Sequence, residues 1–150
     1  MLSNNLVSAI NNQIQFEHYS AFIYKSMEAY FATEDLPGMA NWMNIQFQEE
    51  MAHAEKMFHF VCETGNRVVL QGMDAPHREF TSPLEVFEIA LEHEQIVTAR
   101  INALMDLAQQ EKTMPRRFSC SGLSPNRLKK KQPLIILLPS SNELKEMAAG

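Results

Sequence analysis

The sequence predicts an all-α fold, a bundle of long helices with one long crossover connection. Three stretches within residues 1–112 repeat apolar side chains every three or four positions, which is the spacing of amphipathic helices. The connection between the second and third stretches is seventeen residues long. That is long for a turn between neighbouring antiparallel helices. After residue 112 the helical periodicity stops.

The first predicted helix covers residues 6–31. Its apolar stripe is Val7, Ile10, Ile14, Ala21, Tyr24 and Phe31. Residues 34–38 end it, and Pro37 suits the first position of a second helix, where its missing N–H costs nothing. The second helix runs to about Thr64, and Gly65 can close it in the left-handed conformation. Its stripe is Met39, Met43, Met57 and Phe60.

The third predicted helix has the clearest start, because Ser82 and Glu85 form a capping box around Pro83. It runs to about Lys112. Its stripe is Leu84, Phe87, Leu91, Ile101, Met105 and Ala108. The preceding segment, 66–82, can span a bundle about 30 Å long, since extended chain covers ~3.3 Å per residue. The second and third helices are therefore expected to run parallel.

Composition and charge exclude several classes of protein. Hydrophobic residues make up 45% and charged residues 21%, which is ordinary for a soluble globular protein. No apolar run approaches the roughly 20 residues of a membrane span, and the N-terminus lacks the layout of a secretory signal, so we expect a cytoplasmic protein without a membrane partner. Residues 1–112 hold 16 acidic and 6 basic side chains, which disfavours nucleic acid and suits cations. Cys62 and Cys120 are expected to be reduced thiols.

Each predicted helix places a carboxylate within its apolar stripe, near the middle of its length: Glu17, then Glu50 with His53, then Glu94. All lie roughly 17–20 Å from the helix starts at ~1.5 Å per residue, so they should meet at one level. Ionised carboxylates that face a core need a neutralising cation. The spacing of Glu50 and His53 puts both on one helical face. The sequence therefore predicts a metal centre.

This ligand set predicts the kind of metal. Oxygen-rich ligation with one imidazole suits Fe(II), Mn(II) or Zn(II), and a redox-active pair of irons is the occupant that we expect. Tyr24, two turns beyond Glu17 on the same stripe, can hydrogen-bond a ligand or relay an electron. A lone Glu-x-x-His pair is most often a solvated surface pair, so the prediction depends on the coincidence of three helices. Four other histidines fall off the stripes and are expected at the surface: His18, His59, His77 and His93.

Three segments carry these residues: NQIQFEHYSAFIY, LPGMANWMNIQFQEEMAHAEKM and SPLEVFEIALEHEQIVTARINALMDLA. Together they resemble a bacterial non-haem ferritin over residues 1–112. The resemblance implies a ferritin-like four-helix bundle with one long crossover, in keeping with the connection described above. It also implies a homo-oligomeric shell of twenty-four subunits. Such a shell oxidises Fe(II) with O2 or H2O2 at di-iron centres within each subunit and stores the Fe(III) mineral.

The resemblance also implies roles for individual residues. Glu17, Glu50 and His53 would hold one iron, Glu50 would bridge to a second, and Glu94 would hold that second iron. Tyr24 matches a tyrosine beside the centre. A further acidic side chain, Glu49, matches a residue that helps to bind a third iron in some bacterial members.

Two alternative functions remain open. A haem-containing bacterioferritin is one, because Met51 follows Glu50 as the haem-binding methionine does there, although the sequence EHEQ at 92–95 favours the non-haem type. A defective ferritin subunit without turnover is the other, and the C-terminal segment favours it.

Residues 113–150 depart from the family pattern, in which a fourth long helix carries another acidic ligand pair. Residues 113–142 contain four of the seven prolines, six basic residues and no acidic one. Arg127 and Lys130 stand where ligands should fall, and their charge would repel iron. We therefore expect two parts: helices one to three with the crossover in 1–112, and an anomalous Pro/Arg/Ser-rich segment in 113–150 that replaces the fourth helix.

We hypothesise that residues 113 to about 140 are a ferritin helix translated in another reading frame. Ser, Leu and Arg supply 13 of the 30 residues from 113 to 142, and these residues have the most codons. Translating the coding DNA in all three frames should then reveal an acidic amphipathic helix in one alternative frame. If no frame encodes such a helix, the hypothesis is wrong.

Overall fold

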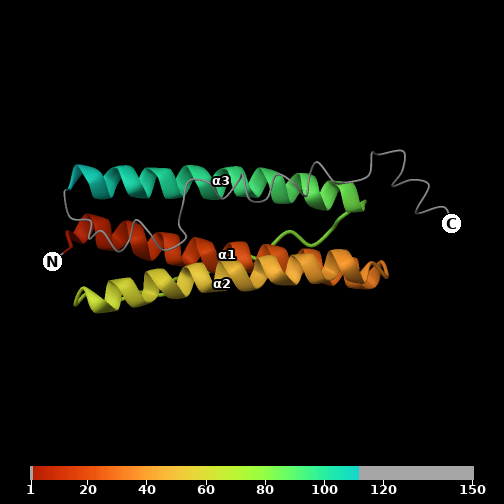
Figure 1. Cartoon of the computed structure of the whole chain (residues 1–150), viewed down its shortest axis with the longest axis horizontal. Coiled ribbons are helices and arrows are strands. Elements are labelled where there is room, and N and C mark those ends of the chain that lie inside the picture. The colour runs from red at the N-terminus through yellow and green to blue at the C-terminus, as the bar shows by residue number, and fades with distance from the viewer. Residues whose placement is uncertain (1, 112–150) are drawn as a thin grey trace.

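A computed structural model describes residues 2–111, which form three long helices and no strands in that range (Figure 1). These are α1 (Asn4–Thr33), α2 (Pro37–Glu63) and α3 (Pro83–Gln110). The bounds lie within a few residues of the predicted ones, so the all-α prediction is confirmed. The predictions for residues 113–150, including Cys120, Arg127 and Lys130, lie outside the described residues.

Helix α1 packs against both α2 and α3 (Figure 1). One apolar cluster joins the start of α1 to the ends of α2 and α3. Its members are Leu2, Leu6, Ile10, Ile14, Met57, Val61, Val97, Ile101, Leu104 and Ala108. A second cluster joins the end of α1 to the starts of the other two helices. Its members are Ile23, Tyr24, Met27, Phe31, Met43, Val86, Phe87 and Ala90. Helices α2 and α3 therefore run parallel to each other and antiparallel to α1, as the long crossover predicted.

The helix ends follow local sequence. The Ser3 hydroxyl caps α1 by accepting from the Leu6 N–H at 3.0 Å. After α2, Gly65 adopts a φ of 75°, the left-handed conformation that glycine enters without a steric cost. At the start of α3 the Ser82 hydroxyl accepts from the Glu85 N–H at 3.2 Å. These contacts satisfy N–H groups that a helix start leaves without intrahelical partners.

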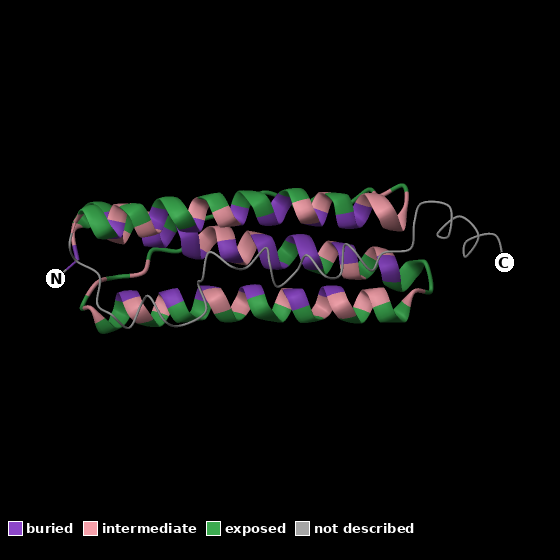
Figure 2. Ribbon diagram, turned by 45° about the horizontal axis from the view of Figure 1, so that its top comes forward, coloured by how far each residue is buried: buried purple, intermediate pink, exposed green. Residues whose placement is uncertain are grey.

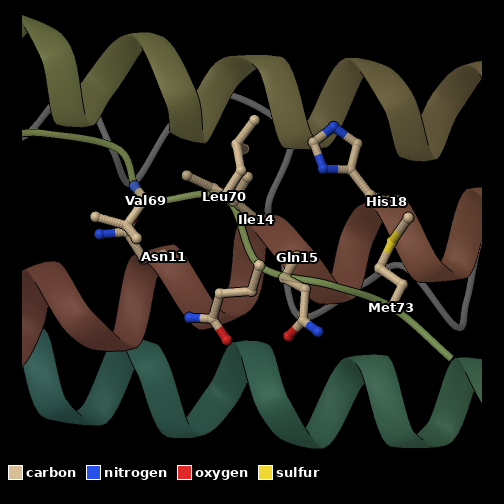
Figure 3. A pocket seen from close by; sticks show the side chains of 8 residues that line it. Asn11, Ile14, Gln15, His18, Val69, Leu70 and Met73 are labelled. Carbon is tan, nitrogen blue, oxygen red and sulfur yellow. Dashed lines mark hydrogen bonds between the residues drawn. The ribbon is translucent and has the colours of Figure 1, made fainter.

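The crossover is held along α1 by amide side chains. Asn11 donates from Nδ2 to the Arg67 carbonyl at 3.4 Å and accepts from the Val69 N–H at 3.0 Å. One turn later Gln15 donates to the Gly72 carbonyl at 2.5 Å. Figure 3 shows Asn11 and Gln15 of α1 beside this segment, where their amides help to line a pocket. The polar side of α1 thus sets the path of the chain that leads to α3.

Buried residues recur along each helix on the sides turned toward the other helices (Figure 2). The stripe predicted for α3 is only partly right, since Leu84, Leu91 and Met105 are half-buried. The buried residues of α3 are Val86, Phe87, Ala90, His93, Glu94, Val97, Ile101, Leu104 and Ala108. None of the helices in residues 2–111 has the length and apolar character that crossing a membrane requires.

The capping of α3 predicts a pH dependence. The Glu85 carboxylate accepts from the Thr81 N–H at 2.5 Å and from the Thr81 hydroxyl at 2.7 Å. These bonds, with the backbone one contributing most, lower the pKa of Glu85 from its ordinary value. Ionised Glu85 therefore stabilises the fold above the ordinary carboxyl pKa, and this contribution is lost as the pH falls through the lowered folded-state pKa.

Glu85→Ala should accordingly lower the melting temperature at about pH 7, and the difference from wild type should shrink as the pH falls below about 4, the ordinary pKa of a carboxyl group. Other acidic groups titrate in both proteins, so they cancel in the difference. Glu88→Ala, at an exposed position one turn beyond the start of α3, is the matched control and should change little at either pH. A Glu85→Ala difference that stays constant with pH would contradict the assignment.

Candidate metal centre

Acidic side chains lie in the gap between the two apolar clusters. Glu17 and Glu50 are fully buried, and Glu94 is 3% exposed. In α1 the apolar cluster residues stop at Ile14 and resume at Ile23, in α2 Met43 and Met57 flank the gap, and in α3 Ala90 and Val97 flank it. Each helix therefore contributes one carboxylate at the middle of the bundle. This is the level at which the sequence placed them.

Glu17, Glu50 and His53 bring their ligand atoms within 4.8 Å of one another. His53 Nδ1 lies 3.2 Å from Glu50 Oε2 and 3.8 Å from Glu17 Oε2. Donor atoms that share one ion at ~2.1 Å each lie about 3–4 Å apart, so a small inward movement closes this trio around a cation. Two carboxylates and one imidazole suit a divalent first-row metal. The residues present therefore fit such an ion.

A bound cation would also offset the electrostatic cost of placing Glu17 and Glu50 side by side. Two ionised carboxylates side by side in a core lose their hydration and repel each other. His53, which is half-buried, can coordinate the same ion through a ring nitrogen once that nitrogen carries no proton. A divalent ion would neutralise both carboxylates at once.

Glu94 lies outside this trio, on the opposite helix. Its Oε1 accepts a hydrogen bond from the Tyr24 hydroxyl at 2.5 Å. Tyr24 is fully buried, and its ring lies 6.4 Å from that of Trp42. Tyr24 thus fixes the position of the α3 carboxylate. Glu49, next to Glu50 in the sequence, is exposed and is not part of the trio.

The prediction that His93 lies at the surface is wrong. His93 is 7% exposed, its Nε2 lies 2.8 Å from the Ser20 Oγ, and its ring stacks on Phe16 at 5.4 Å. Since the Ser20 hydroxyl donates to the Phe16 carbonyl at 2.8 Å, His93 Nε2 must be the donor to Ser20. His59 and His77 are exposed, as predicted, and His18 is half-buried.

The sequence did contain a pattern that includes His93. Positions 86, 90, 93, 97, 101, 104 and 108 repeat every three or four residues and form the buried side of α3. Gln13 is a second residue of the site that was not predicted from the sequence: it is buried and donates to Glu17 Oε1 at 2.9 Å. Its position one turn before Glu17 was the available indication.

Three long helices, one crossover and a buried acidic centre place the chain among the ferritin-like helical bundles. A family model described as "Ferritin-like domain" matches residues 7–115, and the chain belongs to this family. The resemblance to bacterial non-haem ferritins is confirmed by curated relatives.

Among these relatives is a "Bacterial non-heme ferritin" of Bacteroides fragilis, 41% identical over 112 residues, which cover 75% of this chain and 70% of that protein. A "Probable bacterial non-heme ferritin-like protein" of Haemophilus influenzae is 37% identical over 112 residues, 75% of this chain and 68% of the other. Among solved structures, an open pore ferritin from the archaeon Archaeoglobus fulgidus has a TM-score of 0.73 at 49% identity, covering 75% of this chain and 69% of that one.

If the trio binds a cation, a divalent metal should raise the melting temperature of the folded chain. An ion present at a hundredfold its dissociation constant adds ~2.7 kcal/mol to the free energy of unfolding. Co(II) is a suitable ion because air does not oxidise it under mild conditions. We expect it to raise the melting temperature of wild type, and we expect most of this increase to be lost in His53→Ala. His59→Ala, which removes an exposed histidine from the same helix, should keep it. Equal shifts in all three proteins would contradict the site.

Proposed function

We propose that this protein is a ferroxidase that stores iron, oxidising Fe(II) at a centre within each subunit. The observation that carries the proposal is the convergence of Glu17, Glu50 and His53, whose ligand atoms lie within 4.8 Å. These three would bind one Fe(II). Glu50 would bridge to a second Fe(II), held by Glu94. Membership of the ferritin family supports this assignment.

The chemistry that we propose transfers one electron from each of two Fe(II) ions to O2, which takes up two protons and leaves as H2O2. With H2O2 as the oxidant, the same two electrons and two protons yield two water molecules. The carboxylates favour the product because an anionic ligand is attracted more strongly to Fe(III) than to Fe(II). His53 binds as a neutral imidazole, so it adds affinity without adding negative charge.

Tyr24 would keep Glu94 in position during this step. Its hydroxyl bond to Glu94 Oε1 at 2.5 Å engages one carboxylate oxygen. A buried hydrogen bond to a charged group is worth about 1.5–3 kcal/mol, enough to restrict the rotation of the carboxylate. The apolar clusters on both sides limit the access of water, which strengthens the electrostatic interactions within the centre.

We further propose that the subunit stores the oxidised iron as a mineral inside a twenty-four-subunit shell in the cytoplasm. Its relatives support a non-haem protein, because both are named for that type. The bacterioferritin alternative rested on Met51 alone, and the defective-subunit alternative rests on residues 113–150. Size-exclusion chromatography with light scattering would distinguish a shell from a free subunit, and a haem absorbance band after reconstitution would support the bacterioferritin alternative.

Fe(II) oxidation is the direct test of the centre. Aerobic addition of Fe(II) should produce the near-ultraviolet absorbance of Fe(III), and Glu50→Ala should lower the initial rate by more than about tenfold, since even changes beside a metal ligand cost 10–100-fold. Glu55→Ala is the matched control, because it removes an exposed carboxylate from the same helix, α2. It should keep most of the initial rate. Equal rates in Glu50→Ala and wild type would refute the proposed centre.

A further inference from the structure

A chain of hydrogen bonds leads from Glu17 to a cationic side chain on α3. Gln13, one turn before Glu17 on α1, is 2% exposed. Its Nε2 donates to Glu17 Oε1 at 2.9 Å, and its Oε1 accepts from Arg100 Nε at 3.2 Å. A single buried amide therefore connects the guanidinium to the carboxylate.

Arg100 fixes which way the amide of Gln13 points. A guanidinium can only donate hydrogen bonds, so the carbonyl oxygen of Gln13 must face Arg100 and the amide nitrogen must face Glu17. Arg100 is itself held, because its guanidinium lies 4.1 Å from the centre of the Phe16 ring and its Nη2 donates to the Asn12 carbonyl at 3.4 Å. The donor directed at Glu17 is thus set by contacts outside the metal centre.

The two oxygens of Glu17 consequently have different surroundings. Oε1 accepts the Gln13 bond, while Oε2 is the oxygen that lies 3.8 Å from His53 Nδ1 within the trio. A carboxylate can bind a metal through one oxygen or through both. A donor that occupies one oxygen favours binding through the other alone.

We propose that Gln13, oriented by Arg100, is a positioning residue that engages Glu17 Oε1 and makes Glu17 a metal ligand through Oε2 alone. This inference rests on the proposed metal centre. Single-oxygen binding leaves one more coordination position for a further ligand such as the oxidant. The neutral amide also keeps the Arg100 charge away from the carboxylate, where a direct ion pair would compete with the cation.

Cobalt binding to the full chain provides a test without iron turnover. Binding can be followed during addition of Co(II) by the fluorescence of Trp42, the single tryptophan, and by the visible absorbance of the bound ion. Gln13→Met, which keeps the length of the side chain, should weaken Co(II) binding about 10–100-fold, the usual effect of removing a hydrogen bond to a ligand. It should also reduce the intensity of the Co(II) bands, because binding through both oxygens raises the coordination number.

A double-mutant cycle then tests the role of Arg100. Arg100→Met should weaken Co(II) binding by about 3–10-fold, because the Gln13 amide loses the group that orients it. Arg100→Lys should restore part of this affinity, because an ammonium can donate to the same Gln13 oxygen. If Arg100 acts through Gln13, the double variant Gln13→Met/Arg100→Met should bind no more weakly than Gln13→Met alone. Full additivity of the two losses would overturn the proposal.

Melting temperatures and a control variant distinguish the proposed positioning role of Gln13 from a role in packing alone. Asn11→Leu removes another buried amide from α1, one that holds the crossover, and should lower the melting temperature while Co(II) affinity stays at the wild-type value. Gln13→Met with wild-type affinity and unchanged Co(II) bands would overturn the inference and leave the proposed function intact. Wild type that binds Co(II) no better than Glu17→Ala would overturn both.

Discussion

The burial of carboxylates between two apolar clusters is the constraint on which this structure depends. Glu17 and Glu50 come from different helices and meet His53 within 4.8 Å, and two carboxylates that are ionised at this separation repel each other. The apolar clusters on both sides of the centre supply stability that offsets the cost of burying these carboxylates, and long helices are needed to form both clusters. The three helices, of 30, 27 and 28 residues, supply that length.

Helix α1 organises the bundle because each of its sides has a different partner. Its inner side carries Glu17 toward α2. One flank meets α3 through Gln13 and through Ser20, which bonds His93 beside Glu94. The polar outer side holds the crossover through Asn11 and neighbouring amides. The chain is thus led back along α1, so that α3 begins at the same end of the bundle as α2.

The contacts around the centre divide into those that would bind a cation and those that hold the ligands. Gln13 and Tyr24 each donate to one oxygen of a carboxylate, Gln13 to Glu17 and Tyr24 to Glu94. The Gln13 bond joins consecutive turns of α1, and the Tyr24 bond joins α1 to α3. A carboxylate restrained in this way loses less conformational entropy when a metal binds, so the bundle would prepare the geometry that the ion requires.

The sequence by itself determined the helices, their ends and the level of the acidic residues. Pro37, Gly65 and the Ser82–Glu85 capping box act on their own neighbours in the chain, and a carboxylate that interrupts an apolar stripe is visible without knowing what the stripe packs against. The tertiary structure decided which of two overlapping periodic patterns in α3 faces α1, and with it the burial of His93. It also decided that Arg100, 87 residues from Gln13, sets the direction of an amide beside Glu17. Helical periodicity defines a buried side only to within a residue or two, whereas hydrogen-bond partners depend on contacts between segments far apart in the chain.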